Sequence, residues 1–156
     1  MVNIEGKVAV ITGGASGLGR ATAEKIIAKG GKVAVLDLNK DLAEQTAAEL
    51  IEAKAYQVNV TDDDSVKTAV EAVKTHFGSI HINVNCAGVG VSCRTVGKDG
   101  AHDINKFNFI VQVNLVGTFS VFSKCAAIMG LNEPEGEALE KGVIITLPRL
   151  QRSRAK

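Results

Sequence analysis

Short, continuous runs of aliphatic residues alternate with longer segments of helical periodicity along most of this chain. The aliphatic runs, each typical of a strand that is buried on both faces, lie at residues 7–12, 32–37, 55–60, 80–85 and 142–145. The helical segments between them lie at about residues 17–27, 41–53, 61–73 and 107–122. Parallel neighbours in a sheet need a covering crossover, so the alternation predicts an α/β fold, a doubly wound parallel sheet of about five strands.

The composition is that of one such domain. The chain has 156 residues, 46% of them hydrophobic, and its 18 Lys and Arg nearly balance 17 Asp and Glu. A net charge of +1 gives no overall field for nucleic acid or an anionic membrane, and no apolar run approaches the roughly 18 residues that cross a bilayer. The N-terminus has no secretory or presequence pattern, so an intracellular protein, cytoplasmic by default, is expected.

A glycine-rich turn, residues 12–19, lies between the first predicted strand and the first predicted helix. In it, Gly13 would permit a sharp turn, Gly17 would let a ligand approach the backbone, and Gly19 would let the helix pack closely. The helix amides behind such a turn can hold a diphosphate. Asp37, at the end of the second strand, is placed to accept a hydrogen bond from a ribose 2′-hydroxyl. A Rossmann-like fold that binds NAD rather than NADP is therefore predicted.

Other polar residues point to structural roles. Arg20 could contact a phosphate, but a solvated helix arginine is the preferred interpretation. The three histidines show no ligand spacing, and the acids at 62–64 are better explained as a helix N-cap than as a calcium loop. The three cysteines (Cys86, Cys93 and Cys125) are odd in number and irregularly spaced, which indicates a reducing compartment. No metal site is expected.

The spacing Thr12-Gly13-x-x-x-Gly17-x-Gly19, the stretch 85–88 (Asn-Cys-Ala-Gly) and Asn114 resemble the short-chain dehydrogenase/reductase family. The resemblance covers about residues 5–145 and is strongest to family members that oxidise 3-hydroxyacyl-CoA and hydroxysteroids. It implies NAD-dependent hydride transfer with a small-molecule alcohol, ketone or acyl-CoA substrate. It also implies a homo-oligomer in which the long helix packs against a partner subunit, and it suggests the mitochondrial matrix.

The same resemblance assigns roles to individual residues. Ser16 and Leu18 would line the diphosphate and Asp37 the ribose. Asn59, where the family usually has Asp, and Val60 would contact the adenine. The ribose on the nicotinamide side would lie against Cys86, Ala87 and Gly88. Asn114 would support the proton relay by holding a helix kink and an ordered water.

The sequence departs from the family pattern at the residues that carry out the family's reaction. The reaction needs a Tyr with a Lys four residues later, and a Ser after the fifth strand. The only tyrosine, Tyr56, is followed by Val60 at that spacing, and Arg149 stands where the Ser belongs. The chain as given is therefore expected to lack turnover. The alternative is a non-catalytic remnant that binds a cofactor or a protein.

The basic segment 146–156 departs from the strand and helix periodicity and is expected to be an aberrant tail after a domain at 1–145. At this point the family has the segment Asn-Thr-Ala-Ser-Val-Ala-Ala-Phe-Glu-Gly-Gln-Val-Gly. Codons can be chosen for that segment such that the loss of one base shifts the reading frame and gives residues 146–156 in order, followed by a stop codon. We hypothesise a shifted reading frame that removes the family's C-terminal part. An uninterrupted genomic codon series for the tail, with no family sequence in the neighbouring frame, would disprove it. The fifth strand would then be an exposed edge, which makes oligomerisation doubtful.

Overall fold

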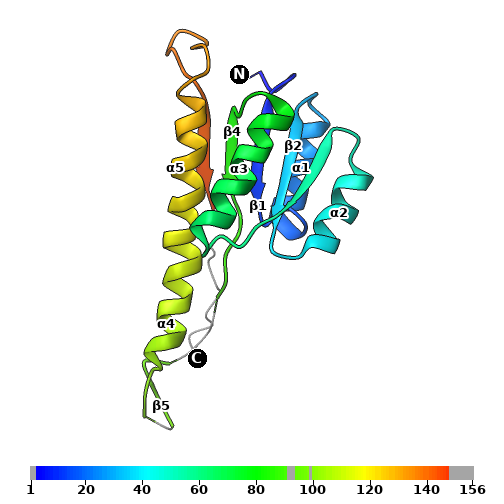
Figure 1. Ribbon diagram of the computed structural model, residues 1–156. Helices are drawn as coiled ribbons and strands as arrows, with labels where there is room; N and C mark the ends of the chain where they lie inside the picture. Colours follow the sequence, from blue (N-terminus) through cyan, green and yellow to red (C-terminus); the bar gives the residue numbers. More distant parts are fainter. Residues whose placement is uncertain (1–2, 91–93, 99, 148–156) are drawn as a thin grey trace.

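A five-stranded parallel sheet forms the centre of the molecule (Figure 1). The computed structural model describes residues 3–90, 94–98 and 100–147. The strand order is β3-β2-β1-β4-β7, and every neighbouring pair is parallel. The strands are β1 (Val8–Thr12), β2 (Lys32–Asp37), β3 (Ala53–Gln57), β4 (Ile82–Asn85) and β7 (Val143–Thr146). The predicted Rossmann-like fold class is confirmed.

Helices cover both faces of the sheet, as parallel crossovers require (Figure 1). The helices are α1 (Gly17–Ile27), α2 (Lys40–Glu49), α3 (Asp63–Phe77) and one long helix made of α4 (Ile104–Val111), a π-helical segment η1 (Gln112–Gly117) and α5 (Thr118–Met129). The two faces of β1 show the division. Val8 and Val10 pack in a core with α3 and α5, whereas Ala9 and Ile11 pack in a second core with α1 and α2.

Several predicted boundaries are wrong at the ends of elements. The helix predicted over 41–53 ends at Glu49, because Leu50 adopts extended backbone angles and the chain then enters β3, whose first residue Ala53 pairs with Val33. The strand predicted over 55–60 ends at Gln57, because the next residues turn toward α3. The loop predicted over 88–101 contains the short hairpin strands β5 (Val96–Gly97) and β6 (Gly100–Ala101).

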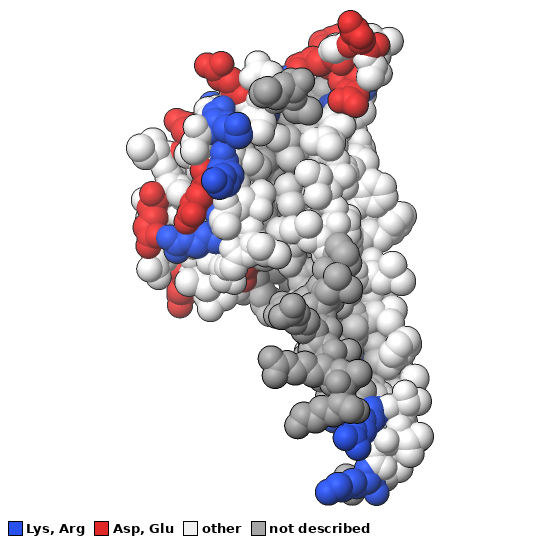
Figure 2. Space-filling model, turned by 180° about the vertical axis from the view of Figure 1, so that it is seen from behind, with Lys and Arg blue, Asp and Glu red and all other residues white. Residues whose placement is uncertain are grey.

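The long helix leaves several large apolar side chains exposed to solvent. Its residues 104–129 are long and apolar enough to cross a membrane by length and composition alone, although Val121 and Cys125 pack in the core of this fold. Burial raises the pKa of the Cys125 thiol to about 12. Figure 2 shows a largely uncharged surface along the side of the molecule that the long helix forms.

Three aromatic side chains of this helix are exposed, and the family resemblance implies that the helix packs against a partner subunit. Their exposed fractions are 54% at Phe107, 61% at Phe119 and 38% at Phe122, and the last two form an edge-to-face pair. They are therefore not core residues of this chain. Contact with a partner subunit stays a prediction, which size-exclusion chromatography would contradict by showing a monomer.

Strand β7 lies at one edge of the described sheet, and Val143 and Ile145 are partly exposed there. Thr146 is the last residue of β7 and pairs with Asn85, so the strand extends one residue past the predicted end of the domain. The remaining tail, 148–156, lies outside the described residues, as do Arg149 and Cys93.

Candidate functional site

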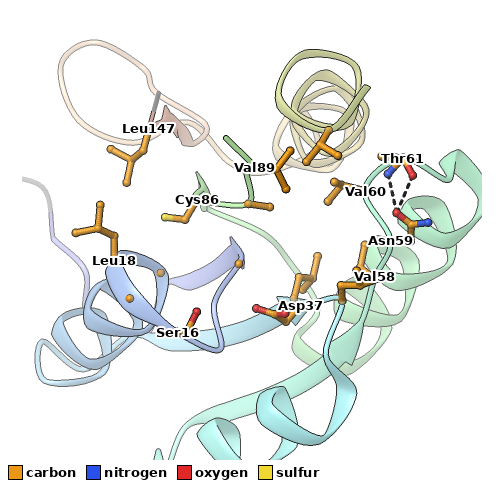
Figure 3. Close-up of a pocket in the computed structure, with 18 of the residues that line it drawn as sticks. Ser16, Leu18, Asp37, Val58, Asn59, Val60, Thr61, Cys86, Val89 and Leu147 are labelled. Carbon is orange, nitrogen blue, oxygen red and sulfur yellow. Dashed lines mark hydrogen bonds between the residues drawn. The ribbon is translucent and has the colours of Figure 1, made fainter. Parts of the chain in front are cut away.

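A cleft of about 680 Å³ opens at the carboxyl ends of the strands, where ligands bind in open α/β sheets (Figure 3). Its walls come from the turn after β1, the ends of β2 and β3, the loop after β4 and the long helix. It is lined by all eleven residues predicted to contact the cofactor: Gly13, Ser16, Gly17, Leu18, Gly19, Asp37, Asn59, Val60, Cys86, Ala87 and Gly88. The structure thus brings together residues spread along the sequence from Gly13 to Gly88.

The glycine-rich turn forms the floor of the cleft, and three of its glycines meet different requirements. Gly13 has a φ of +62°, and a Cβ there would lie 3.0 Å from the backbone nitrogen of Ala87. A Cβ on Gly19 would lie only 2.1 Å from the carbonyl oxygen of Gly13. Gly17 has a φ of +52° and open space in front of it. The turn is thus closed against the protein behind and accessible from the cleft.

The first turn of α1 lies at the floor of the cleft. It contains no acidic residue, and the side chain of Ser16, the N-cap residue, makes no capping hydrogen bond. Helix N-termini attract anions through their free N–H groups and the helix dipole. The floor of the cleft is therefore suited to a phosphate or diphosphate.

Arg20 contributes to helix packing. Its guanidinium forms ion pairs with Glu24 on the same helix and with Glu49 on α2, and these partners raise the pKa of Arg20. The alternative of a phosphate contact is thus not favoured, because both acidic partners already occupy the side chain.

Asp37 lies beside the glycine-rich turn at the carboxyl end of β2 (Figure 3). One carboxylate oxygen accepts a hydrogen bond from the backbone nitrogen of Ala15 at 3.2 Å, and the other accepts one from Asn39 at 3.1 Å. Each carboxylate oxygen has a second lone pair, so the carboxylate can still accept hydrogen bonds from the two hydroxyls of a diol. Asp37 therefore also holds the turn in place, a role that the sequence analysis missed.

The loop after β4 forms the opposite wall of the cleft. The backbone nitrogen of Ala87 donates to the hydroxyl of Thr12 at 3.1 Å, so the buried end of β1 positions this loop. Cys86 is half-buried, and desolvation raises the pKa of its thiol. A thiol in that state is a poor nucleophile, so Cys86 serves as a wall of the cleft. Thr12 was not singled out as a positioning residue from the sequence, although it directly precedes Gly13.

Asn114 lies within η1 and does not line the cleft. Its side-chain oxygen accepts from the backbone nitrogen of Val89 at 2.8 Å, and its side-chain nitrogen donates to the carbonyl of Val89 at 2.8 Å. Both polar atoms are thus used on the loop after β4. Asn114 is a positioning residue here, located in the irregular segment of the helix where a kink was expected.

Replacing Asn114 by alanine is expected to lower the free energy of unfolding by about 2 kcal/mol, because both backbone groups of Val89 lose their partner in a half-buried site. Urea denaturation measures the change. Asn108→Ala, an exposed asparagine of α4, is the control and should be nearly neutral. Equal effects of the two substitutions would contradict the role of Asn114.

The remaining candidates lie away from the cleft. Tyr56 belongs to β3, its ring packs against a core, and burial raises the pKa of its hydroxyl. His81 accepts a hydrogen bond from the backbone nitrogen of Val8 at 3.1 Å, and burial lowers its pKa. Asp62 caps α3 as predicted. Within the described ranges, no three His, Cys, Asp or Glu side chains group as metal ligands would.

Comparison with known proteins decides the family. The family model for short chain dehydrogenases matches residues 7–147. The chain belongs to the short-chain dehydrogenase family. This is a family of oxidoreductases. The chain is 40% identical over 146 residues to 3-hydroxyacyl-CoA dehydrogenase type-2 of Bos taurus. It is also 40% identical over 146 residues to the protein of the same name in Homo sapiens. Both alignments cover 92% of this chain and 56% of the relative.

A solved structure of a short-chain dehydrogenase shares the fold. The crystal structure of 3-hydroxyacyl-CoA dehydrogenase type-2 from Mycobacterium avium matches with a TM-score of 0.84 at 33% identity. The match covers 94% of this chain and 58% of that structure. The chain therefore spans a little over half the length of the relatives it matches.

Proposed function

We propose that this chain forms the cofactor-binding part of an NAD-dependent oxidoreductase that transfers hydride between the nicotinamide and a secondary alcohol or ketone of 3-hydroxyacyl-CoA or hydroxysteroid type. The observation that carries the proposal is the position of Asp37 beside an open glycine-rich turn at the carboxyl edge of the sheet. The substrate class is supported by the relatives named above.

The residues present fit the dinucleotide. The turn 13–19 is accessible at Gly17 and would hold the diphosphate through backbone amides. Asp37 would accept from the adenosine ribose, and its negative charge would repel a 2′-phosphate. The end of the cleft at Asn59 and Val60 would hold the base, and the wall 86–88 would hold the second ribose. Bound NAD supplies the hydride acceptor.

Proton transfer to the alcohol oxygen needs an acid/base group, and among the residues that the structure describes no tyrosine or lysine lines the cleft. The chain's one tyrosine, Tyr56, has its hydroxyl buried in β3, outside the cleft. We therefore expect this chain to bind the cofactor without turning over substrate. A binding module without an enzymatic role is the second candidate, and the same observation favours it.

Fluorescence titration with NADH, followed by an assay of acetoacetyl-CoA reduction, tests both candidates on the full chain. We expect saturable enhancement of NADH fluorescence and no oxidation of NADH. Turnover matching that of a complete family member would contradict the argument on proton transfer. Absence of saturable binding to folded protein would contradict the proposed function itself.

A further inference from the structure

Strand β7 is an edge strand, so only one side of its backbone is paired within the described part of the chain. Its neighbour there is β4. The backbone nitrogens of Val143 and Leu147 donate toward β4 at 2.9 and 3.1 Å. In a parallel ladder, alternate residues direct both backbone groups to the same neighbouring strand. The N–H and C=O groups of Ile144 and Thr146 therefore point outward from the sheet.

The same strand carries aliphatic side chains that the fold leaves partly exposed. Ile144 packs in the core with α3 and α5. Because side chains alternate along a strand, Val143, Ile145 and Leu147 lie on the opposite face of the sheet. Their exposed fractions are 38%, 44% and 38%. The edge at β7 thus combines outward backbone groups with exposed aliphatic side chains.

The two edges of the sheet differ in their protection against pairing. Residues 142–147 contain no charged residue and no proline, which are the usual obstacles to a further strand. The other edge is β3, where Lys54 is exposed in the strand and its ammonium lies 6.0 Å from the centre of the Tyr56 ring. A lysine at that place opposes the approach of another strand. Of the two edges, β7 is therefore the one suited to accept a strand.

A second copy of β7 fits this edge when the two strands run antiparallel about a twofold axis at Ile145. Ile144 then lies opposite Thr146 of the partner subunit, and such a pair exchanges both of its N–H···O bonds. The side chain of Ile145 meets its own counterpart, and Val143 faces Leu147 of the partner subunit. One symmetric arrangement thus supplies partners for the outward backbone groups and for the exposed aliphatic side chains of the strand.

Helix α5 extends the apolar surface beside this edge. Val121 and Cys125 pack in the core beneath the helix, and Ser120 donates to Asp63 of α3. Phe122 is rotated by about 100° from Val121, on the side away from Ser120 and α3. It is exposed, and α5 lies alongside β7 in Figure 1. A second copy at the edge would therefore also cover apolar surface of α5.

We propose that the chain self-associates through β7, so that two copies form one continuous sheet across a twofold axis at Ile145. This inference goes beyond the proposed function, and its test needs no dinucleotide. Analytical ultracentrifugation of the full chain at about 100 µM should show a dimer. Ile145→Lys puts two like charges opposite each other and should weaken dimerisation by at least about tenfold. Ile51→Lys, the same change at an exposed residue just before β3, is the control and should leave dimerisation unchanged.

A cysteine at the axis tests the register without adding charge. In the proposed pairing, the two Cα atoms of residue 145 lie about 4.5 Å apart, within the roughly 4.4–6.8 Å that a disulfide spans. Mild oxidation of Ile145→Cys should therefore join two copies through residue 145, and mass spectrometry of the linked peptides identifies the bond. Ile51→Cys is the matched control and should give no disulfide between two residues 51.

A monomer at about 100 µM would overturn the inference. A dimer that Ile145→Lys leaves intact would also overturn it, because the contact would then lie elsewhere, such as on the long helix. If circular dichroism shows that Ile145→Lys is unfolded, the cysteine variant decides, and the absence of a bond between two residues 145 overturns the inference. None of these outcomes bears on NADH binding, which the fluorescence titration measures separately.

Discussion

Gly19→Ala should lower the free energy of unfolding by about 3 kcal/mol and weaken NADH binding by about 100-fold. The added Cβ would lie 2.1 Å from the carbonyl oxygen of Gly13 and 2.8 Å from its carbonyl carbon. These are backbone atoms of the turn itself, so the clash can be relieved only by moving α1 away from the turn. Urea denaturation and NADH fluorescence measure the two effects.

Gly130→Ala is the control for this substitution. Gly130 has a φ of −57°, and the atoms nearest to its added Cβ lie at 3.5 Å, an ordinary contact. It should change the stability by no more than about 0.5 kcal/mol and leave NADH binding unchanged. If Gly19→Ala were as mild as Gly130→Ala, the close packing of α1 on the turn would not be needed for binding.

Asp37→Ala should change the ratio of NADH to NADPH affinity by about 100-fold, which corresponds to ~2.7 kcal/mol. Two effects add. The variant loses a charge-assisted hydrogen bond to the ribose diol, which weakens NADH binding, and it loses the repulsion of the 2′-phosphate, which strengthens NADPH binding. Competitive titration with the two reduced dinucleotides measures the ratio.

The same variant removes the acceptor of the Ala15 nitrogen, so a stability loss of about 1 kcal/mol is expected beside the change in affinity. Thermal unfolding separates the two effects. Asp41→Ala removes an equal charge from the exposed first turn of α2 and should leave the affinity ratio unaltered. If Asp37→Ala left the ratio of NADH to NADPH affinity unchanged, this carboxylate would not contact the ribose that distinguishes the two dinucleotides.

Much of the site could be predicted because its residues are set by local chain geometry. Gly13 and Gly17 stand at positive φ in a turn between a buried strand and a helix, and their spacing is visible in the sequence. The ends of the elements were harder to predict. Ala53 fits the helical spacing of the preceding segment, but its pairing with Val33 places it in β3. Alanine is compatible with a helix or a strand, so the pairing with β2 determined that Ala53 belongs to β3.

The order of strands and helices along the chain, the glycine-rich turn and the acid at the tip of the second strand follow from the sequence by itself, because each depends on residues close together in the chain. Tertiary structure alone decided what those residues contact. Thr12 holds Ala87 and Asn114 holds Val89 across long stretches of chain. Only folding showed that the long helix leaves Phe119 exposed. Hydrogen-bond partners and burial are properties of packed neighbours, and the sequence pattern shows only the groups available to pair.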